Sequence, residues 1–247
     1  MPDVLGWRKK FGVLLPSSNT IVEPDFYSMA VPGVTVHGCR IWIDERGGGN
    51  GPTGHEPRTY SDQAQPAVQR LLTSEPDALI MGISGPTFRG GVEGNRRWKE
   101  LMREYSGGMN IANNAEACQR ALKMLEVSRI GVLTPYQSSA SADVIRFFSE
   151  SGFEVVSHKD LECPNPLAIA QVGEDQCRKA LVEMNNDSVQ AIVQAGTNLN
   201  FLRLAAEAER WLGKPVLASN AVTWWMALRD NDIQDKIFGY GRILSDF

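Results

Sequence analysis

The sequence has 247 residues, which is enough for one large α/β domain or two small ones with an ample hydrophobic core. Hydrophobic residues make up 43% and charged residues 22%, and the formal net charge of −4 gives no basic surface of the kind that binds nucleic acid. No apolar run approaches the roughly 20 residues that span a bilayer, and the first ten residues do not resemble a secretory signal.

The cysteines and histidines are dispersed. No pair of cysteines has C-x-x-C spacing, which favours free thiols in a reducing compartment, and we therefore expect a cytoplasmic protein. The histidines show no metal-ligand spacing, so we expect no metal site. The residues concerned are Cys39, Cys118, Cys163 and Cys177, and His37, His55 and His158.

Short apolar strands alternate with amphipathic helices in the first half. The first predicted strand, 11–15, stops at Pro16, and the capping residues 17–20 that follow open a helix or a loop. A loop rich in Gly and Pro, 45–57, is predicted to be mobile and is a candidate lid. The other predicted elements are strands 34–43, 77–81 and 109–113 and helices 61–72, 93–105 and 114–125.

The same alternation restarts at residue 129. Strands are predicted at 129–134, 153–157, 190–194 and 214–218, and helices at 141–151, from 165 or 166 to about 185 with interruptions, at 200–212 and at 221–230. Strands that alternate with helices throughout predict mainly parallel sheets.

Three segments of the first half resemble three segments of the second, in the same order. They are 12–16 with 131–135, the loop at Gly82 with the loop at Gly196, and 114–122 with 220–228. The repeat predicts two α/β lobes related by a pseudo-two-fold axis. We expect residues 1–113 plus 221–247 to form the first lobe and 114–220 the second, with the site in the cleft between them.

The two signature segments, 77–88 and 190–201, each consist of a buried strand that ends in Gly, small hydroxyl or amide residues and Phe. Ligands of open α/β sheets bind at such strand-end loops. Together with 16–20 and 135–138, these loops are rich in hydroxyls, amides and backbone N–H groups and poor in charge. Such a set binds carboxylates and would stabilise an enediolate.

Several residues of these loops have two interpretations. Asn19 and Asn165 either bind a substrate carboxylate or cap a helix. Tyr136 either donates to an oxyanion or packs its ring. Arg89 either holds an anion or is solvated on a surface loop.

Three segments carry a family resemblance. Residues 16–20 resemble the N-terminal motif of maleate cis–trans isomerases, 81–90 resemble a loop of arylmalonate decarboxylase, and 207–216 resemble the same region in both. Both belong to the aspartate/glutamate racemase superfamily. The resemblance covers nearly the whole chain and implies two pseudo-symmetric lobes, no cofactor and a site in the cleft between the lobes.

The sequence departs from the family pattern at the two catalytic cysteines, because the matching positions are Gly82 and Gly196. The resemblance still implies a carboxylate cage, and this set comprises Asn19, Gly82, Ile83, Ser84, Tyr136, Asn165, Gly196, Thr197 and Asn198.

Three residues are candidates to replace the missing thiols as proton donor. Cys163 precedes Asn165 by two residues, although the residue type favours a buried, inert thiol. His55 on the Gly-rich loop could supply a proton near neutral pH, although its position on a loop favours a solvated histidine. Tyr136 is already part of the cage, and Ser84 is a further residue, with a hydroxyl, that we place among the catalytic candidates.

The sequence thus favours a cofactor-independent lyase of the decarboxylase type, or an isomerase, that acts on a small carboxylic or dicarboxylic acid. The alternatives are a maleate-type isomerase or hydratase with a non-cysteine acid–base, a non-catalytic small-acid binding protein, and a hydrolase that activates water with Glu23, Asp25 or His55. We expect a homo-oligomer, and Trp224 and Trp225 belong either to the core or to a subunit interface.

Overall fold

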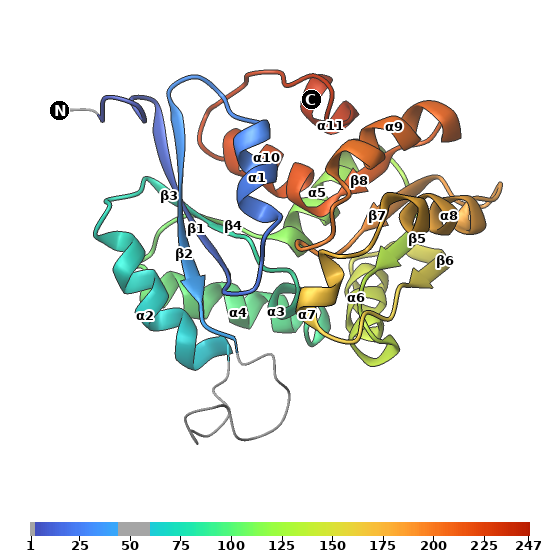
Figure 1. The fold of residues 1–247 in the computed structure, drawn as a ribbon, viewed down its shortest axis with the longest axis horizontal. Helices are drawn as coiled ribbons and strands as arrows, with labels where there is room; N and C mark the ends of the chain where they lie inside the picture. Colours follow the sequence, from blue (N-terminus) through green and yellow to red (C-terminus); the bar gives the residue numbers. More distant parts are fainter. Residues whose placement is uncertain (1–2, 44–59) are drawn as a thin grey trace.

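The computed structural model describes residues 3–43 and 60–247, so the predicted loop 45–57 and its His55 lie outside the described residues. Within those ranges the chain forms two parallel four-stranded sheets, which Figure 1 shows side by side. The first has the order β2-β1-β3-β4 and the second β6-β5-β7-β8. The strands are β1 (Lys9–Pro16), β2 (Val34–Ile41), β3 (Ala78–Met81), β4 (Ile111–Ala112), β5 (Arg129–Thr134), β6 (Glu154–Asp160), β7 (Ala191–Gln194) and β8 (Val216–Ala218).

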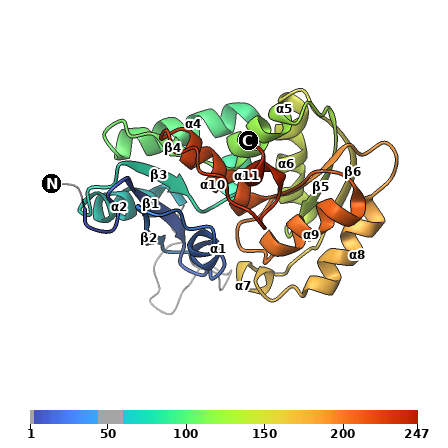
Figure 2. The same cartoon turned by 90° about the horizontal axis from the view of Figure 1, so that it is seen from above.

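Helices cover both sheets, as Figure 2 shows in a view from above. They are α1 (Val22–Ser28), α2 (Tyr60–Leu72), α3 (Gly85–Phe88), α4 (Gly91–Tyr105), α5 (Asn114–Met124), α6 (Ser138–Glu150), α7 (Pro166–Ile169), α8 (Glu174–Met184), α9 (Leu202–Leu212), α10 (Ser219–Arg229) and α11 (Arg242–Ser245). The interrupted helix predicted from 165 is α7 followed by α8, which begins after Gly173 in extended backbone. The one-turn helices α3 and α11 were not predicted, because they are too short to show a periodic pattern.

The predicted fold is confirmed, since two parallel α/β sheets share one strand order. The central strands β3 and β7 are buried along their whole length because helices cover both faces. Leu14 of β1 lies beside Met81 of β3, and Leu133 of β5 lies beside Gln194 of β7. The strand-end loops after β1 and β3 therefore start together, as do those after β5 and β7.

Helix α10 packs between the two sheets. It contacts β3 and β4 of the first sheet and β8 of the second, and its residues from Ser219 to Leu228 are all buried. The Trp224 ring packs against Phe11 and Phe26, with centroids 5.6 and 5.2 Å apart, and its Nε1 donates to the Met29 carbonyl at 3.0 Å. Trp224 and Trp225 thus belong to the core of this chain. The predicted lobe boundaries stay a prediction.

None of the helices in the described part of the chain combines the length and the apolar character needed to cross a membrane.

Candidate active site

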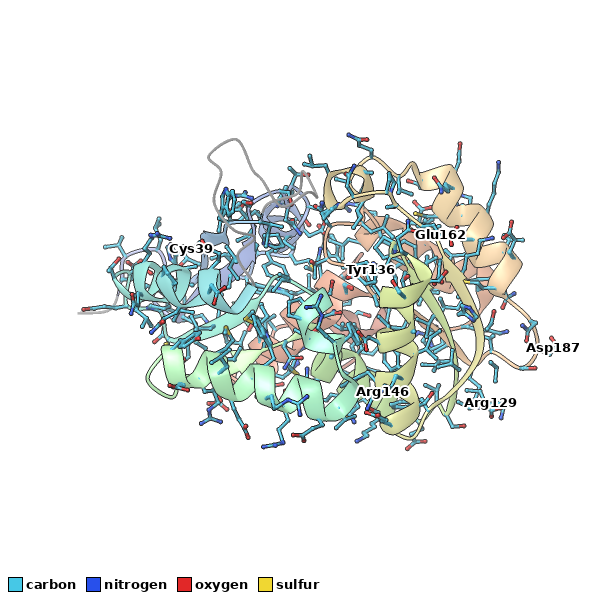
Figure 3. The ribbon with its side chains drawn as sticks, turned by 90° about the horizontal axis from the view of Figure 1, so that it is seen from below. Cys39, Arg129, Tyr136, Arg146, Glu162 and Asp187 are labelled. Atoms are coloured by element: carbon cyan, nitrogen blue, oxygen red, sulfur yellow. The ribbon has the colours of Figure 1, made fainter. Side chains whose placement is uncertain are left out.

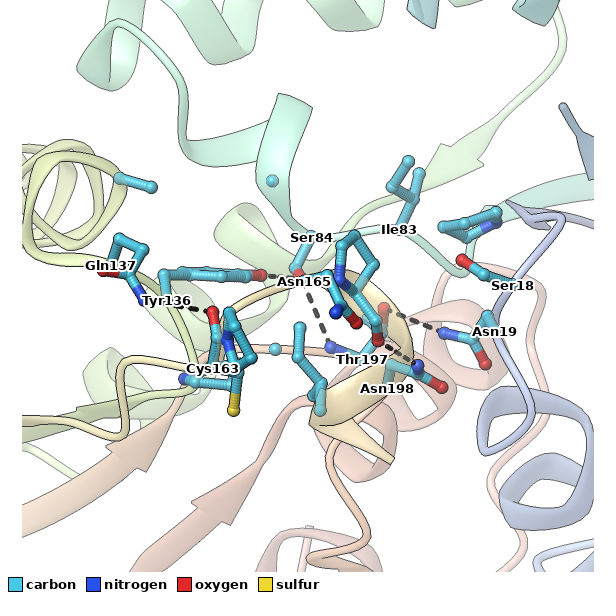
Figure 4. A pocket seen from close by; sticks show the side chains of 18 of the residues that line it. Ser18, Asn19, Ile83, Ser84, Tyr136, Gln137, Cys163, Asn165, Thr197 and Asn198 are labelled. Atoms are coloured by element: carbon cyan, nitrogen blue, oxygen red, sulfur yellow. Dashed lines mark hydrogen bonds between the residues drawn. The ribbon is translucent and has the colours of Figure 1, made fainter. Parts of the chain in front are cut away.

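A pocket of about 310 Å³ lies where the strand-end loops of the two sheets face each other (Figure 4). The loops after β1, β3, β5 and β7 contribute to its wall, and so do the segment before α7 and α7 itself. The described residues that line it are Pro16, Ser18, Asn19, Ile83, Ser84, Gly85, Arg89, Pro135, Tyr136, Gln137, Ala140, Cys163, Pro164, Asn165, Pro166, Ile169, Gly196, Thr197 and Asn198.

Thr197 joins the two signature loops across this pocket. Its backbone N–H donates to Ser84 Oγ at 3.2 Å, and its hydroxyl donates to the Gly82 carbonyl at 3.2 Å. Thr197 is only 4% exposed, so these bonds form away from bulk water. The bonds fix the end of β7 against the end of β3, and the pocket is built around this connection.

Ser84 also contacts Tyr136, the first residue after the Pro135 that ends β5. The two hydroxyl oxygens lie 2.5 Å apart, and either can be the donor. Since Ser84 Oγ already accepts the Thr197 N–H, the three residues form one hydrogen-bonded chain. Figure 3 shows Tyr136, which follows the end of β5, toward the middle of the molecule. Arg129, the first residue of β5, lies at the edge of the molecule.

Asn19 bonds to the start of α1 and also lines the pocket, while its binding of a carboxylate stays a prediction. Its Oδ1 accepts the N–H groups of Ile21 and Val22 at 3.0 and 2.9 Å, which satisfies donors at the start of α1. Its Nδ2 points to the Thr197 hydroxyl at 3.5 Å, and the side chain lines the pocket. The bonds at Oδ1 hold the amide so that Nδ2 faces the Thr197 hydroxyl in the pocket wall.

Asn165 and Asn198 define the side of the pocket formed by α7. Asn165 Oδ1 accepts the Ala168 N–H at 2.9 Å, so Asn165 caps α7. Asn165 also lines the pocket. Asn198 Oδ1 accepts the Thr20 N–H at 3.0 Å, and its Nδ2 donates to the Pro166 carbonyl at 3.0 Å. Asn198 therefore connects α7 to the loop that follows β1.

Neither signature glycine has room for a side chain. Gly196 has a φ of +146°, and an added Cβ would lie 2.6 Å from the Pro135 ring. An added Cβ at Gly82 would lie 2.9 Å from Val22 and 3.2 Å from the Leu14 carbonyl. Gly196 lines the pocket, but Gly82 does not, because it lies below the surface with its carbonyl engaged by Thr197.

Cys163 lines the pocket and is 9% exposed. Burial raises the pKa of its thiol, which disfavours the thiolate. In Figure 4 its sulfur points away from the pair formed by Ser84 and Tyr136. The remaining predicted donor, His55, lies outside the described residues.

Two charged residues behind the pocket were not predicted to shape it. Arg40 of β2 donates to the carbonyls of Asn19 and Ser17 at 2.7 and 3.2 Å and pairs with Glu23. It thereby holds the loop that carries Asn19. No sequence pattern indicates this role, because Arg40 is far from that loop along the chain.

Asp25 of α1 is 9% exposed, and its Oδ2 accepts a hydrogen bond from Asn220 Nδ2 at 2.7 Å. Asn220 Nδ2 also donates to the Thr197 carbonyl at 3.1 Å. Asn220 therefore lies between the Asp25 carboxyl and Thr197 in the pocket wall. Burial raises the pKa of Asp25 to about 6 despite the bond from Asn220 and the charge of Arg203. Neither Asp25 nor Glu23 is among the described lining residues.

The lining includes residues that the sequence interpretation did not select. Gln137 follows Tyr136, and its Nε2 donates to the carbonyls of Glu162 and Cys163 at 2.7 and 3.1 Å. Ile169 comes one turn after Asn165, a spacing that would have placed it on the same side of a helix. Within the described residues no group of three or more His, Cys, Asp or Glu side chains is placed to hold a metal ion.

Comparisons with known proteins match this chain to arylmalonate decarboxylase and to maleate isomerases. The family model described as arylmalonate decarboxylase matches residues 60–244. The maleate isomerase of Pseudomonas putida is 22% identical over 253 residues, covering 96% of this chain and 97% of that protein. The maleate isomerase of Nocardia farcinica is 23% identical over 245 residues, covering 96% and 95%.

Solved structures extend this likeness to the fold. A cysteine-to-serine mutant of the Nocardia farcinica maleate cis-trans isomerase, with a covalently bound succinylcysteine intermediate, has a TM-score of 0.85 at 22% identity, covering 97% of this chain and 99% of that one. Unliganded arylmalonate decarboxylase has a TM-score of 0.76 at 20% identity, covering 96% and 98%.

We predict that Asp25→Asn changes how stability depends on pH. Because the pKa of Asp25 is raised from 3.8 to about 6 on folding, the native state keeps a proton that the unfolded state releases between these values. The contribution of Asp25 to stability therefore falls as pH rises from about 4 to 6, and Asp25→Asn removes this loss, which amounts to roughly 3 kcal/mol above pH 6. Urea unfolding between pH 4 and 7 measures this pH dependence of the unfolding free energy. The control is Asp187→Asn, which changes an exposed aspartate. Parallel curves for Asp25→Asn and wild type would contradict the prediction.

We also predict that Gly196→Ala costs at least about 2 kcal/mol of unfolding free energy, because the Cβ meets Pro135 and the backbone φ is unfavourable for any L side chain. Gly85→Ala is the matched control, since a Cβ there meets no atom within 4 Å. Equal midpoints for the two variants in urea would show that the loop relaxes freely around residue 196.

Proposed function

Since the chain belongs to the arylmalonate decarboxylase family, we propose that it is a cofactor-independent enzyme that decarboxylates a small dicarboxylic acid through an enediolate. The observation that carries the proposal is the pocket wall, in which uncharged donors from both sheets converge beside the hydrogen-bonded chain of Tyr136, Ser84 and Thr197. Such donors stabilise charge that develops on a carboxylate oxygen.

In the proposed reaction the carboxylate that remains on the substrate is held by Asn19 and Asn165 and by the loop at Thr197. The bond between the α-carbon and the second carboxylate breaks, and carbon dioxide leaves. The electron pair moves into the remaining carboxylate and forms the enediolate. Asn19 supports this role because its Oδ1 is occupied at the start of α1, which turns Nδ2 toward Thr197 in the pocket wall, where one N–H contacts the Thr197 hydroxyl and the other remains for a ligand.

We assign the proton donor to Tyr136. Its hydroxyl transfers a proton to the α-carbon, and the resulting tyrosinate regains a proton from water. Ser84 supports this step because its Oγ bonds both Tyr136 and the Thr197 N–H, so it can stabilise the phenolate oxygen. Cys163 is the weaker candidate, since burial raises the pKa of its thiol.

A second candidate function is the cis–trans isomerisation of a maleate-like dicarboxylate. It is favoured by the relatives matched over 96% of this chain, which are maleate isomerases. Nucleophilic addition to the double bond would fall to Cys163, the one thiol among the described lining residues. We rank it second because Gly82 and Gly196, the positions that we match to the family cysteines, carry no thiol.

Proton NMR in deuterated water separates these functions. The protein is incubated with phenylmalonate, methylmalonate and maleate. Decarboxylation releases carbon dioxide and places deuterium on the α-carbon of the product, whereas isomerisation converts maleate to fumarate. Binding without turnover of any of them would indicate a binding protein.

We predict that Tyr136→Phe lowers the decarboxylation rate at least about 100-fold, with KM changed less than about threefold, because it removes the proton donor and keeps the ring. Tyr27→Phe, which alters an exposed tyrosine of α1, is the matched control and should keep full activity. Cys163→Ala should keep most of the decarboxylase activity. A fully active Tyr136→Phe would assign the proton donor to another group.

A further inference from the structure

A second cavity of about 230 Å³ adjoins the candidate active site. It shares Gly85, Arg89, Tyr136 and Ala140 with the first pocket and extends between α3 and the start of α6. The two cavities meet beside Gly85, where an added Cβ would contact no atom within 4 Å. A group attached to a substrate in the first pocket can therefore extend past Tyr136 into the second.

Arg89 stands at this junction. It is exposed, and it is the only charged side chain among the described residues that line the first pocket. Within the described residues its guanidinium has no ion pair or side-chain hydrogen bond, in contrast to Arg96 and Arg146, which pair with glutamates of their own helices. Its charge is thus available to a ligand, and a guanidinium recognises carboxylates well.

The backbone around Arg89 is held in place. The Arg89 N–H donates to the Gly85 carbonyl at 3.1 Å, and Asn95 Nδ2 donates to the Thr87 carbonyl at 2.7 Å. Gly94 passes so close that an added Cβ would lie 1.9 Å from the Arg89 carbonyl oxygen. The side chain therefore starts from a fixed point between α3 and α4.

Asp143 is the acidic residue in the second cavity. Its Oδ1 accepts the Gly90 N–H at 3.2 Å, and it interacts electrostatically with Arg146 on the same helix. Both interactions direct the Asp143 carboxylate toward Gly90 and Arg146, and Arg89 is the basic side chain among the described residues that line the cavity.

We infer that the second cavity is a subsite for a carboxylate on the substrate's side chain, with Arg89 as the residue that binds it. The inference rests on the proposed function, because it places the reacting end of the substrate in the first pocket. The substrate class is accordingly a malonate-type acid whose α-carbon bears a short chain that ends in a further carboxylate.

Two probes with side chains of equal length test the subsite. The side chain of butylmalonate ends in a methyl group, and that of (3-carboxypropyl)malonate ends in a carboxylate. Isothermal titration calorimetry should show that the wild-type protein binds the tricarboxylate about 10-fold or more tightly than butylmalonate. Arg89→Gln should remove this preference and leave the affinity for butylmalonate within about twofold, and Arg89→Lys should restore part of it. Gly85→Val, which fills the junction, should weaken the binding of both probes.

Arg103→Gln removes the same charge from an exposed position of α4 away from both cavities and is the matched control. The inference is overturned if the wild-type protein shows no preference for the tricarboxylate, or if Arg89→Gln and Arg103→Gln act alike. Failure of the proposed function gives a different result: butylmalonate would be bound without turnover, or its binding would be insensitive to Asn19→Ala, while the preference due to Arg89 persists.

Discussion

The structure depends on the hydrogen bonds that Thr197 makes across the junction of the two sheets. Two strand-end loops that are far apart in sequence meet because the Thr197 N–H and hydroxyl are satisfied by Ser84 and by the Gly82 carbonyl. A buried polar group without such a partner costs on the order of 1–3 kcal/mol, so these bonds fix one relative position of the loops. The helix α10, buried between both sheets, supports the same position from behind.

This arrangement gives a pocket in which Arg89 is the one charged side chain among the described lining residues and the other polar groups are neutral. Amides and hydroxyls donate hydrogen bonds to a carboxylate and do not bring a counter-charge that must itself be desolvated. Arg40 and Asp25 lie one layer further out, where they hold the loop of Asn19 and the amide of Asn220 and do not line the pocket. These two charged residues therefore position the pocket wall, and apart from Arg89 at the junction with the second cavity, the polar groups of its described surface are neutral.

Most of the fold could be predicted from the sequence, because buried strands and the repeated segments are local patterns. The strand-end rule likewise located Asn19, Ser84, Tyr136 and Thr197, whose residue types and positions at strand ends are visible in one dimension. The contributions of Arg40 and Asp25 could not be predicted, since each acts through contacts with segments distant in sequence. Gly82 was predicted to bind substrate, but its depth below the pocket surface depends on how Val22 and Leu14 pack around it.

The close approach of Gly196 to Pro135 has an evolutionary consequence. Any side chain placed at 196 meets the proline ring and requires a backbone conformation that it disfavours, so a change of Pro135 relieves the contact and leaves the backbone strain. Pro135 also adjoins Tyr136, which means that a compensating change there would disturb the phenol. The descendants of this protein are thus constrained by epistasis: a single codon change that places a nucleophile at position 196 carries a stability cost, whereas a side chain added at Gly85, which also lines the pocket, meets no atom within 4 Å.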